Sequence, residues 1–143
     1  MNPIPPSGLQ QKVCYWIAVN SFYNFYRMVW RLKVTGLENV PKTGGVILAS
    51  NHLSVADPPL IGCTSPRKTF FFAKEELFKV PFIGWGITQL NAFPVRRSAH
   101  DVGAFRTAKH ILENCQALAL FPEGRRSRTG EMGPAKPGVG MLA

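Results

Sequence analysis

The chain has 143 residues and 45% of them are hydrophobic, which is enough to form one folded domain with its own core and argues against intrinsic disorder. Its 17 Lys and Arg residues exceed its 8 Asp and Glu residues, giving a net charge of +9. Such an excess predicts an anionic partner, which could be nucleic acid, anionic lipid or a phosphorylated substrate.

Residues 9–32 are expected to form an amphipathic helix after a Pro-rich tail. Four polar residues recur along it at steps of four, three and four: Asn20, Asn24, Arg27 and Arg31. Most of the other residues are apolar or aromatic, a composition that favours a helix lying in the membrane interface. An arginine at mid-membrane is costly, which argues against a lone membrane span. A partly inserted hairpin or span and a helix packed on the core are the alternatives.

A histidine and an aspartate stand five positions apart directly after a predicted buried strand, residues 45–49. Side chains with this spacing do not meet on a straight helix or on a strand. Asp57 precedes Pro58 and is expected to be the N-cap of a short helix. We therefore predict that Asp57 folds back onto the ring of His52, as in a general base held by a carboxylate.

The rest of the chain alternates predicted strands and helices, which indicates an α/β fold with a mostly parallel or mixed sheet flanked by helices. We expect the site at the carboxyl ends of the strands, where His52, Arg96 and Glu123 each follow a predicted strand. A capping box at Ser98–Asp101 is expected to begin the last long helix. The further predicted strands cover residues 33–40, 68–73, 87–93 and 117–121, and the helices cover 58–63, 74–80 and 102–115.

Four segments of the sequence carry a resemblance: Asn51-His52-x4-Asp57, Lys74-x-Glu76-Leu77-x3-Pro81-x2-Gly84, Phe93-Pro94-Val95-Arg96 and Phe121-Pro122-Glu123-Gly124-x-Arg126-Ser127. The first, third and fourth resemble the first three motifs of the glycerolipid acyltransferases, in particular the lysophosphatidic acid acyltransferases, and the second resembles the segment that follows their first motif. The resemblance extends from about Val34 to the last residue, so an acyltransferase domain is expected over residues 33–143, after a membrane-docking segment over 1–32. Lys136-Pro137-Gly138 is similar to the start of a helix that precedes the family's fourth motif. We therefore expect the chain to be truncated before that motif, with an incomplete sheet.

The resemblance implies transfer of a fatty acyl group from acyl-CoA or acyl carrier protein to 1-acylglycerol 3-phosphate, giving phosphatidic acid without a cofactor. His52 would take the proton of the acceptor hydroxyl, and Asp57 would fix the ring tautomer and stabilise the imidazolium. Another lysolipid or glycerol 3-phosphate is an alternative acceptor. A catalytically incomplete membrane- or lipid-binding fragment of such an enzyme is the rival interpretation.

The same resemblance implies roles for four further residues. Arg96 would bind the substrate phosphate, and Arg126 would share that task. Glu123 would orient the glycerol hydroxyls or fix an arginine. Gly124 would allow close approach of the backbone and offer its amide to the tetrahedral oxyanion.

The expected partners are a phospholipid membrane, at its cytoplasmic face, together with the lysophospholipid and the acyl donor. Nucleic acid is not expected, because the aromatic residues are not interleaved with Lys and Arg on one platform. Three cysteines and three histidines lack metal-ligand spacing, so no metal site is expected. The odd number of cysteines without CxxC spacing favours reduced thiols.

Overall fold

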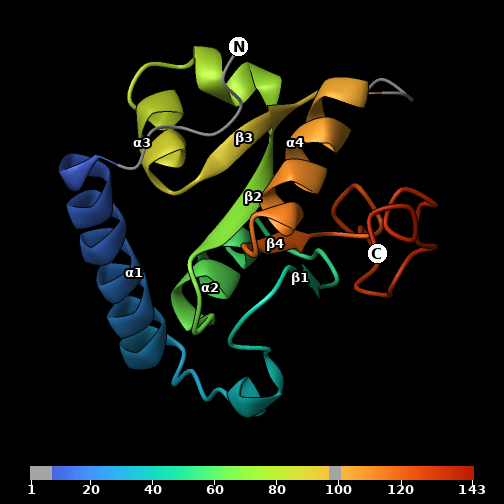
Figure 1. Cartoon of the computed structure of the whole chain (residues 1–143). Coiled ribbons are helices and arrows are strands. Elements are labelled where there is room, and N and C mark those ends of the chain that lie inside the picture. Colours follow the sequence, from blue (N-terminus) through green and yellow to red (C-terminus); the bar gives the residue numbers. More distant parts are fainter. Residues whose placement is uncertain (1–7, 97–100) are drawn as a thin grey trace.

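The computed structural model describes residues 8–96 and 101–143, which form a parallel sheet flanked by helices (Figure 1). The α/β architecture expected from the sequence is therefore confirmed. In chain order the elements are α1 (Leu9–Val29), η1 (Leu37–Asn39), β1 (Val46–Ala49), α2 (Asp57–Thr64), β2 (Thr69–Lys74), η2 (Glu75–Lys79), α3 (Ile83–Gln89), β3 (Ala92–Val95), α4 (Val102–Glu113) and β4 (Ala117–Leu120).

The sheet of the described residues has the strand order β1-β4-β2-β3, so the last strand in sequence lies inside the sheet. All three strand pairs are parallel, and Ala49 pairs with Leu120 where β1 and β4 end. Parallel strands direct their carboxyl ends to one edge. The loops that follow β1 and β4 therefore leave the sheet side by side.

Neighbouring residues of β2 and β4 pack against opposite faces of the sheet, because successive strand side chains point to opposite sides. Phe70 and Leu118 belong to a core shared with Ile111 of α4. Phe71 and Ala119 belong to a second cluster, on the side of α2 and α3. All four residues of β4 are buried, as expected for a central parallel strand covered on both faces.

Two predicted strands are wrong in whole or in part. Residues 33–40 form no strand, because Gly36 adopts a φ of 78° and turns the chain into the short helix η1. Residues 87–89 of the predicted strand 87–93 belong to α3, and β3 begins only at Ala92. Gly84 lets the start of α3 pack on η2, since a Cβ there would lie 2.4 Å from the carbonyl oxygen of Phe78. Only glycine lets this turn pack so closely on η2.

Two helix starts differ from the prediction, and a third helix, α4, begins at Val102 as expected. The segment after β2 is a 3-10 helix, η2, rather than an α-helix over 74–80. Asp57 is the first residue of α2 rather than its N-cap, because its carboxylate accepts hydrogen bonds from residues upstream. Asp101 caps α4 by accepting the N–H of Ala104, whereas Ser98 of the expected capping box lies outside the described residues.

Helix α1 packs along α2, and its N-terminal part contacts the C-terminal end of α3 (Figure 1). The Gln11 amide donates to Asn91 Oδ1 at 3.2 Å, and the Tyr26 hydroxyl donates to the carbonyl of Ala56 at 3.0 Å. The helix ends at Val29, so Arg31, the last residue of the expected polar stripe, lies outside it. Within residues 8–96 and 101–143, none of the helices has the length and hydropathy needed to cross a membrane.

Candidate active site

The loop between β1 and α2 brings His52 and Asp57 together, as predicted. His52 Nδ1 lies 2.8 Å from Asp57 Oδ2, which also accepts the backbone N–H groups of Leu53 and Ser54 at 2.7 Å each. A carboxylate only accepts hydrogen bonds, so Nδ1 carries the ring proton of the neutral imidazole. The lone pair on Nε2 is then available to accept a proton.

The surroundings of Asp57 favour its charged form. Burial alone would raise its pKa, but the hydrogen bonds from Ser54, His52 and Leu53 outweigh burial and lower the pKa below its ordinary value of 3.8. A lowered carboxyl pKa stabilises the folded loop fully above pH 3.8, and this stabilisation is lost as the pH falls through the lowered value. At neutral pH a negative charge therefore faces the ring and stabilises its protonated form.

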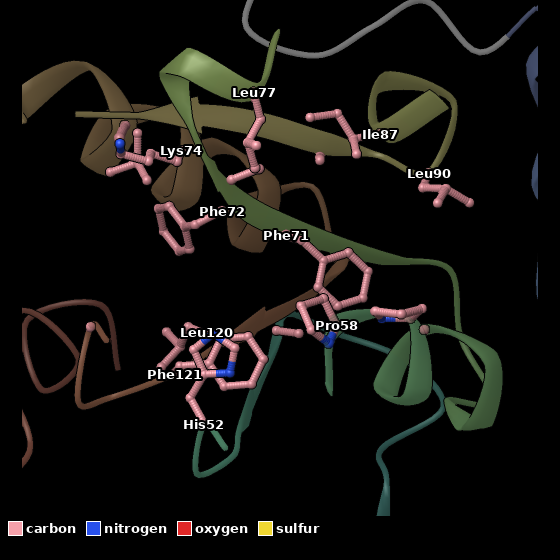
Figure 2. A pocket seen from close by; sticks show the side chains of 18 of the residues that line it. His52, Pro58, Phe71, Phe72, Lys74, Leu77, Ile87, Leu90, Leu120 and Phe121 are labelled. Carbon is pink, nitrogen blue, oxygen red and sulfur yellow. The ribbon is translucent and has the colours of Figure 1, made fainter. Parts of the chain in front are cut away.

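The segment that follows β4 holds His52 from the other side. The ring stacks on Phe121 with centroids 4.0 Å apart and planes 18° from parallel, and both side chains are visible in Figure 2. The His52 carbonyl accepts the N–H of Ser127 at 2.6 Å. The orientation of the ring is therefore set jointly by the β1–α2 loop and by the residues after β4.

Glu123 links the two segments through backbone contacts that the sequence did not reveal. Its Oε1 accepts the N–H of His52 at 3.2 Å, and its Oε2 accepts the N–H of Gly133 at 3.2 Å. The side chain is buried, and in the described part of the chain no arginine pairs with it. One carboxylate oxygen thus holds the His52 loop, and the other holds the backbone at Gly133.

Arg96 follows β3, as expected, but its guanidinium is paired with a residue that sequence reasoning missed. Arg96 Nε lies 2.8 Å from Oε2 of Glu75, the first residue of η2, and the Arg96 side chain is 71% exposed. The Arg96 backbone N–H donates to Asp101 Oδ2 at 2.7 Å. A phosphate bound at Arg96 has to compete with the Glu75 carboxylate.

Gly124 and Arg126 lie beside the same cavity as His52. Gly124 has a φ of 65°, a conformation that favours glycine, and its N–H donates to the carbonyl of Phe121 at 2.9 Å. The expected role of this amide at an oxyanion would require that bond to break. Arg126 is exposed, and none of the described carboxylates pairs with it.

These residues surround a cavity of about 870 Å³ whose walls are largely apolar. Strands β2 and β4 contribute Phe71, Phe72 and Leu120, and Figure 2 shows them with His52 around the pocket. Helix α1 lines the cavity too, through residues that include Phe22. An apolar cavity with a few convergent polar groups suits a ligand with a long hydrocarbon part and an anionic head.

The described residues contain no cluster of three or more His, Cys, Asp or Glu side chains able to hold a metal ion. The cations that line the cavity are instead the groups suited to an anionic ligand: Lys74, Arg96, Arg125, Arg126 and Lys136. The site is therefore a His–Asp pair beside a basic, apolar-walled cavity, at the carboxyl ends of parallel strands.

A parallel α/β sheet with this pair after its first strand is the framework of an acyltransferase domain. The family model described as Acyltransferase matches residues 31–143, and the chain belongs to this family.

The chain is similar to several proteins named 1-acyl-sn-glycerol-3-phosphate acyltransferase. It is 33% identical to that of Saccharomyces cerevisiae over 94% of this chain and 46% of the yeast protein. It is 30% identical to chloroplastic LPAT1 of Arabidopsis thaliana over 90% of this chain and 35% of the plant protein. The crystal structure of the 1-acyl-sn-glycerophosphate (LPA) acyltransferase PlsC from Thermotoga maritima gives a TM-score of 0.68 at 32% identity, covering 92% of this chain and 52% of that one. The chain thus spans about half or less of these proteins.

Proposed function

We propose that the protein transfers a fatty acyl group from acyl-CoA or acyl carrier protein to the free hydroxyl of 1-acylglycerol 3-phosphate, giving phosphatidic acid. The observation that carries the proposal is the His52–Asp57 pair, at 2.8 Å, on the wall of the apolar cavity. The names of the relatives support this choice of acceptor. The acyl donor is a substrate in this proposal, and no bound cofactor takes part.

In the proposed reaction His52 acts as the general base. Its Nε2 takes the proton of the acceptor hydroxyl while that oxygen attacks the thioester carbonyl carbon, forming a C–O bond and an oxyanion. The tetrahedral intermediate then collapses, the C–S bond breaks, and the imidazolium returns the proton to the thiolate. Asp57 stabilises the imidazolium between the two transfers. A positioned base of this kind contributes about 100- to 10,000-fold to the rate.

The walls of the cavity fit the two ends of the acceptor. Phe71, Phe72 and Leu120 offer apolar surface to hydrocarbon. Arg126 offers a guanidinium without a described carboxylate partner, and Arg96 becomes available where a phosphate displaces Glu75.

The test is acceptor-dependent thiol release from an acyl-CoA, compared between the wild-type chain and His52→Ala. We expect His52→Ala to lower the rate at least about 100-fold, because the base is removed. His110→Ala is the matched control, since His110 is exposed on α4 and lies outside the cavity. Equal acceptor-dependent release from wild type and His52→Ala would refute the mechanism. Absence of release from the wild type would favour the lipid-binding fragment.

We also propose that α1 docks the protein on the cytoplasmic face of a phospholipid membrane. Its inner face is occupied by contacts such as that of Tyr26, whereas Trp16 is 67% exposed and Met28 is 81% exposed. Large exposed apolar side chains beside basic residues suit a lipid interface.

Flotation with vesicles of phosphatidylcholine and phosphatidylglycerol tests this docking. The double substitution Trp16→Asp and Met28→Asp should release the chain from the vesicles. Phe22 is unsuitable for the test because it lines the cavity. Met132→Asp is the control, because Met132 is 79% exposed but does not belong to α1. Unchanged flotation of the double variant would contradict the proposal.

A further inference from the structure

Lys136 reaches the cavity from the segment that follows β4, and no role for it follows from the reaction described above. Its backbone N–H donates to the carbonyl of Pro122 at 2.9 Å. Pro122 stands between Phe121, on which the His52 ring stacks, and Glu123, which accepts the His52 N–H. Lys136 is thus anchored to the residues that hold the base, and it lines the same cavity as His52.

The outer part of the Lys136 side chain lies directly over Gly124. A Cβ at position 124 would be 2.9 Å from the Lys136 Nζ, 3.0 Å from its Cε and 3.2 Å from its Cδ. Any side chain there would therefore push the ammonium away. Gly124 satisfies two requirements at once: it adopts a φ of 65°, and it leaves room for this lysine.

The Lys136 ammonium, unlike two other cations of the cavity, is not paired with a carboxylate of the described residues. Lys74 and Arg96, which line the same cavity, pair with Glu76 and Glu75 respectively. Over residues 8–96 and 101–143, no carboxylate lies within 4.0 Å of the Lys136 Nζ, and the ammonium donates no hydrogen bond. All three of its N–H groups are available to a ligand.

We propose that Lys136 binds the phosphate of the acceptor, together with Arg126. This inference rests on the proposed function and adds a lysine to the two arginines of its phosphate site. A phosphate monoester carries close to two negative charges at neutral pH, so an ammonium and a guanidinium on one segment, neither paired with a described carboxylate, suit it. Acyl-CoA also carries phosphates, and its thioester lies at the end of the molecule that must approach His52. The proposal commits to the phosphate of the acceptor.

Lys136→Met tests the inference, because methionine preserves an unbranched side chain over Gly124 and removes the charge. With lysophosphatidic acid as acceptor we expect KM to rise about tenfold or more and kcat to change little, as for the loss of a charge-assisted hydrogen bond. With monoacylglycerol, which lacks the phosphate, KM should stay the same. Lys136→Arg should restore most of the affinity. Lys42→Met is the matched control, because Lys42 is exposed and outside the cavity.

Three results would overturn the inference: an unchanged KM, an equal rise for both acceptors, or a rise confined to acyl-CoA, which would assign Lys136 to the donor. A second measurement needs no activity. Glycerol 3-phosphate should raise the Tm of the wild-type chain and of Lys42→Met but not of Lys136→Met, and a wild-type Tm that does not respond would also overturn the inference. Lys136-dependent binding without acyl transfer would reject the proposed function alone. His52-dependent transfer unaffected by Lys136→Met would reject the phosphate contact alone.

Discussion

Replacing Glu123 by glutamine tests whether this side chain holds the site together or binds substrate. The substitution keeps the shape of the side chain and turns one carboxylate oxygen into an amide NH₂. Because the two oxygens accept the N–H groups of His52 and Gly133, one of these donors must then face another donor. The side chain is 7% exposed, so water offers little compensation.

The expected cost of Glu123→Gln is the loss of one hydrogen bond to a charged group, about 1.5–3 kcal/mol of the free energy of unfolding. For a chain of this size that corresponds to a fall in Tm of roughly 4–12 °C. Glu131→Gln is the control, because Glu131 is exposed. The Tm of that variant should differ from that of the wild type by no more than about 1 °C. Thermal unfolding followed by circular dichroism measures both.

Kinetics separate the two roles of Glu123 further. If the carboxylate positions the His52 loop, Glu123→Gln lowers kcat, since the base is displaced, and leaves KM for the acceptor nearly constant. If the carboxylate orients the glycerol hydroxyls, as the family resemblance implies, KM rises and Tm stays unchanged. A Tm equal to that of the wild type, together with a raised KM, would refute the structural reasoning.

Two further predictions concern the surroundings of the site. Glu75→Gln should lower KM for lysophosphatidic acid severalfold, because it frees Arg96, whereas Arg96→Ala should raise that KM with little effect on the KM for the acyl donor. A raised KM in Glu75→Gln, a lowered KM in Arg96→Ala, or an equal rise in KM for both substrates in Arg96→Ala would contradict this prediction. Burial raises the pKa of the Cys63 thiol to about 11, so its thiolate fraction at pH 8 is on the order of one in a thousand. Iodoacetamide at pH 8 should therefore modify the exposed Cys115 and spare Cys63 until the pH approaches 11, and rapid labelling of both would contradict this.

The sequence was most informative where chemistry is local. The contact between His52 and Asp57 could be predicted because a five-residue spacing between a strand and a proline leaves few ways for the chain to turn. Arg96 directly follows β3, as predicted, although only residues 92 and 93 of the predicted strand 87–93 belong to β3. These predictions needed only the geometry of one loop or one strand.

The sequence was least informative where residues distant in the chain meet. Glu123 contacts the backbone of His52 across 71 positions, and Glu75 contacts Arg96 across 21, and neither contact has a local pattern. The apolar run at 87–93 was predicted as one strand, but a short apolar run does not separate helix from strand, and residues 87–89 belong to α3. The close approach of Gly84 in α3 to Phe78 is a tertiary contact that no local pattern reveals.

The strand order has a consequence for how the His52 loop forms during folding. In the described sheet β1 has β4 as its hydrogen-bonded neighbour, and β4 also pairs with β2. On a ribosome the His52 loop emerges early but has no strand to support it until residue 120 is available. The nearby pair β2 and β3 can form first, and β4 must then insert between β2 and β1. Formation of the His52 site therefore waits for β4, and slow closure of this long loop should set the folding rate of the described sheet.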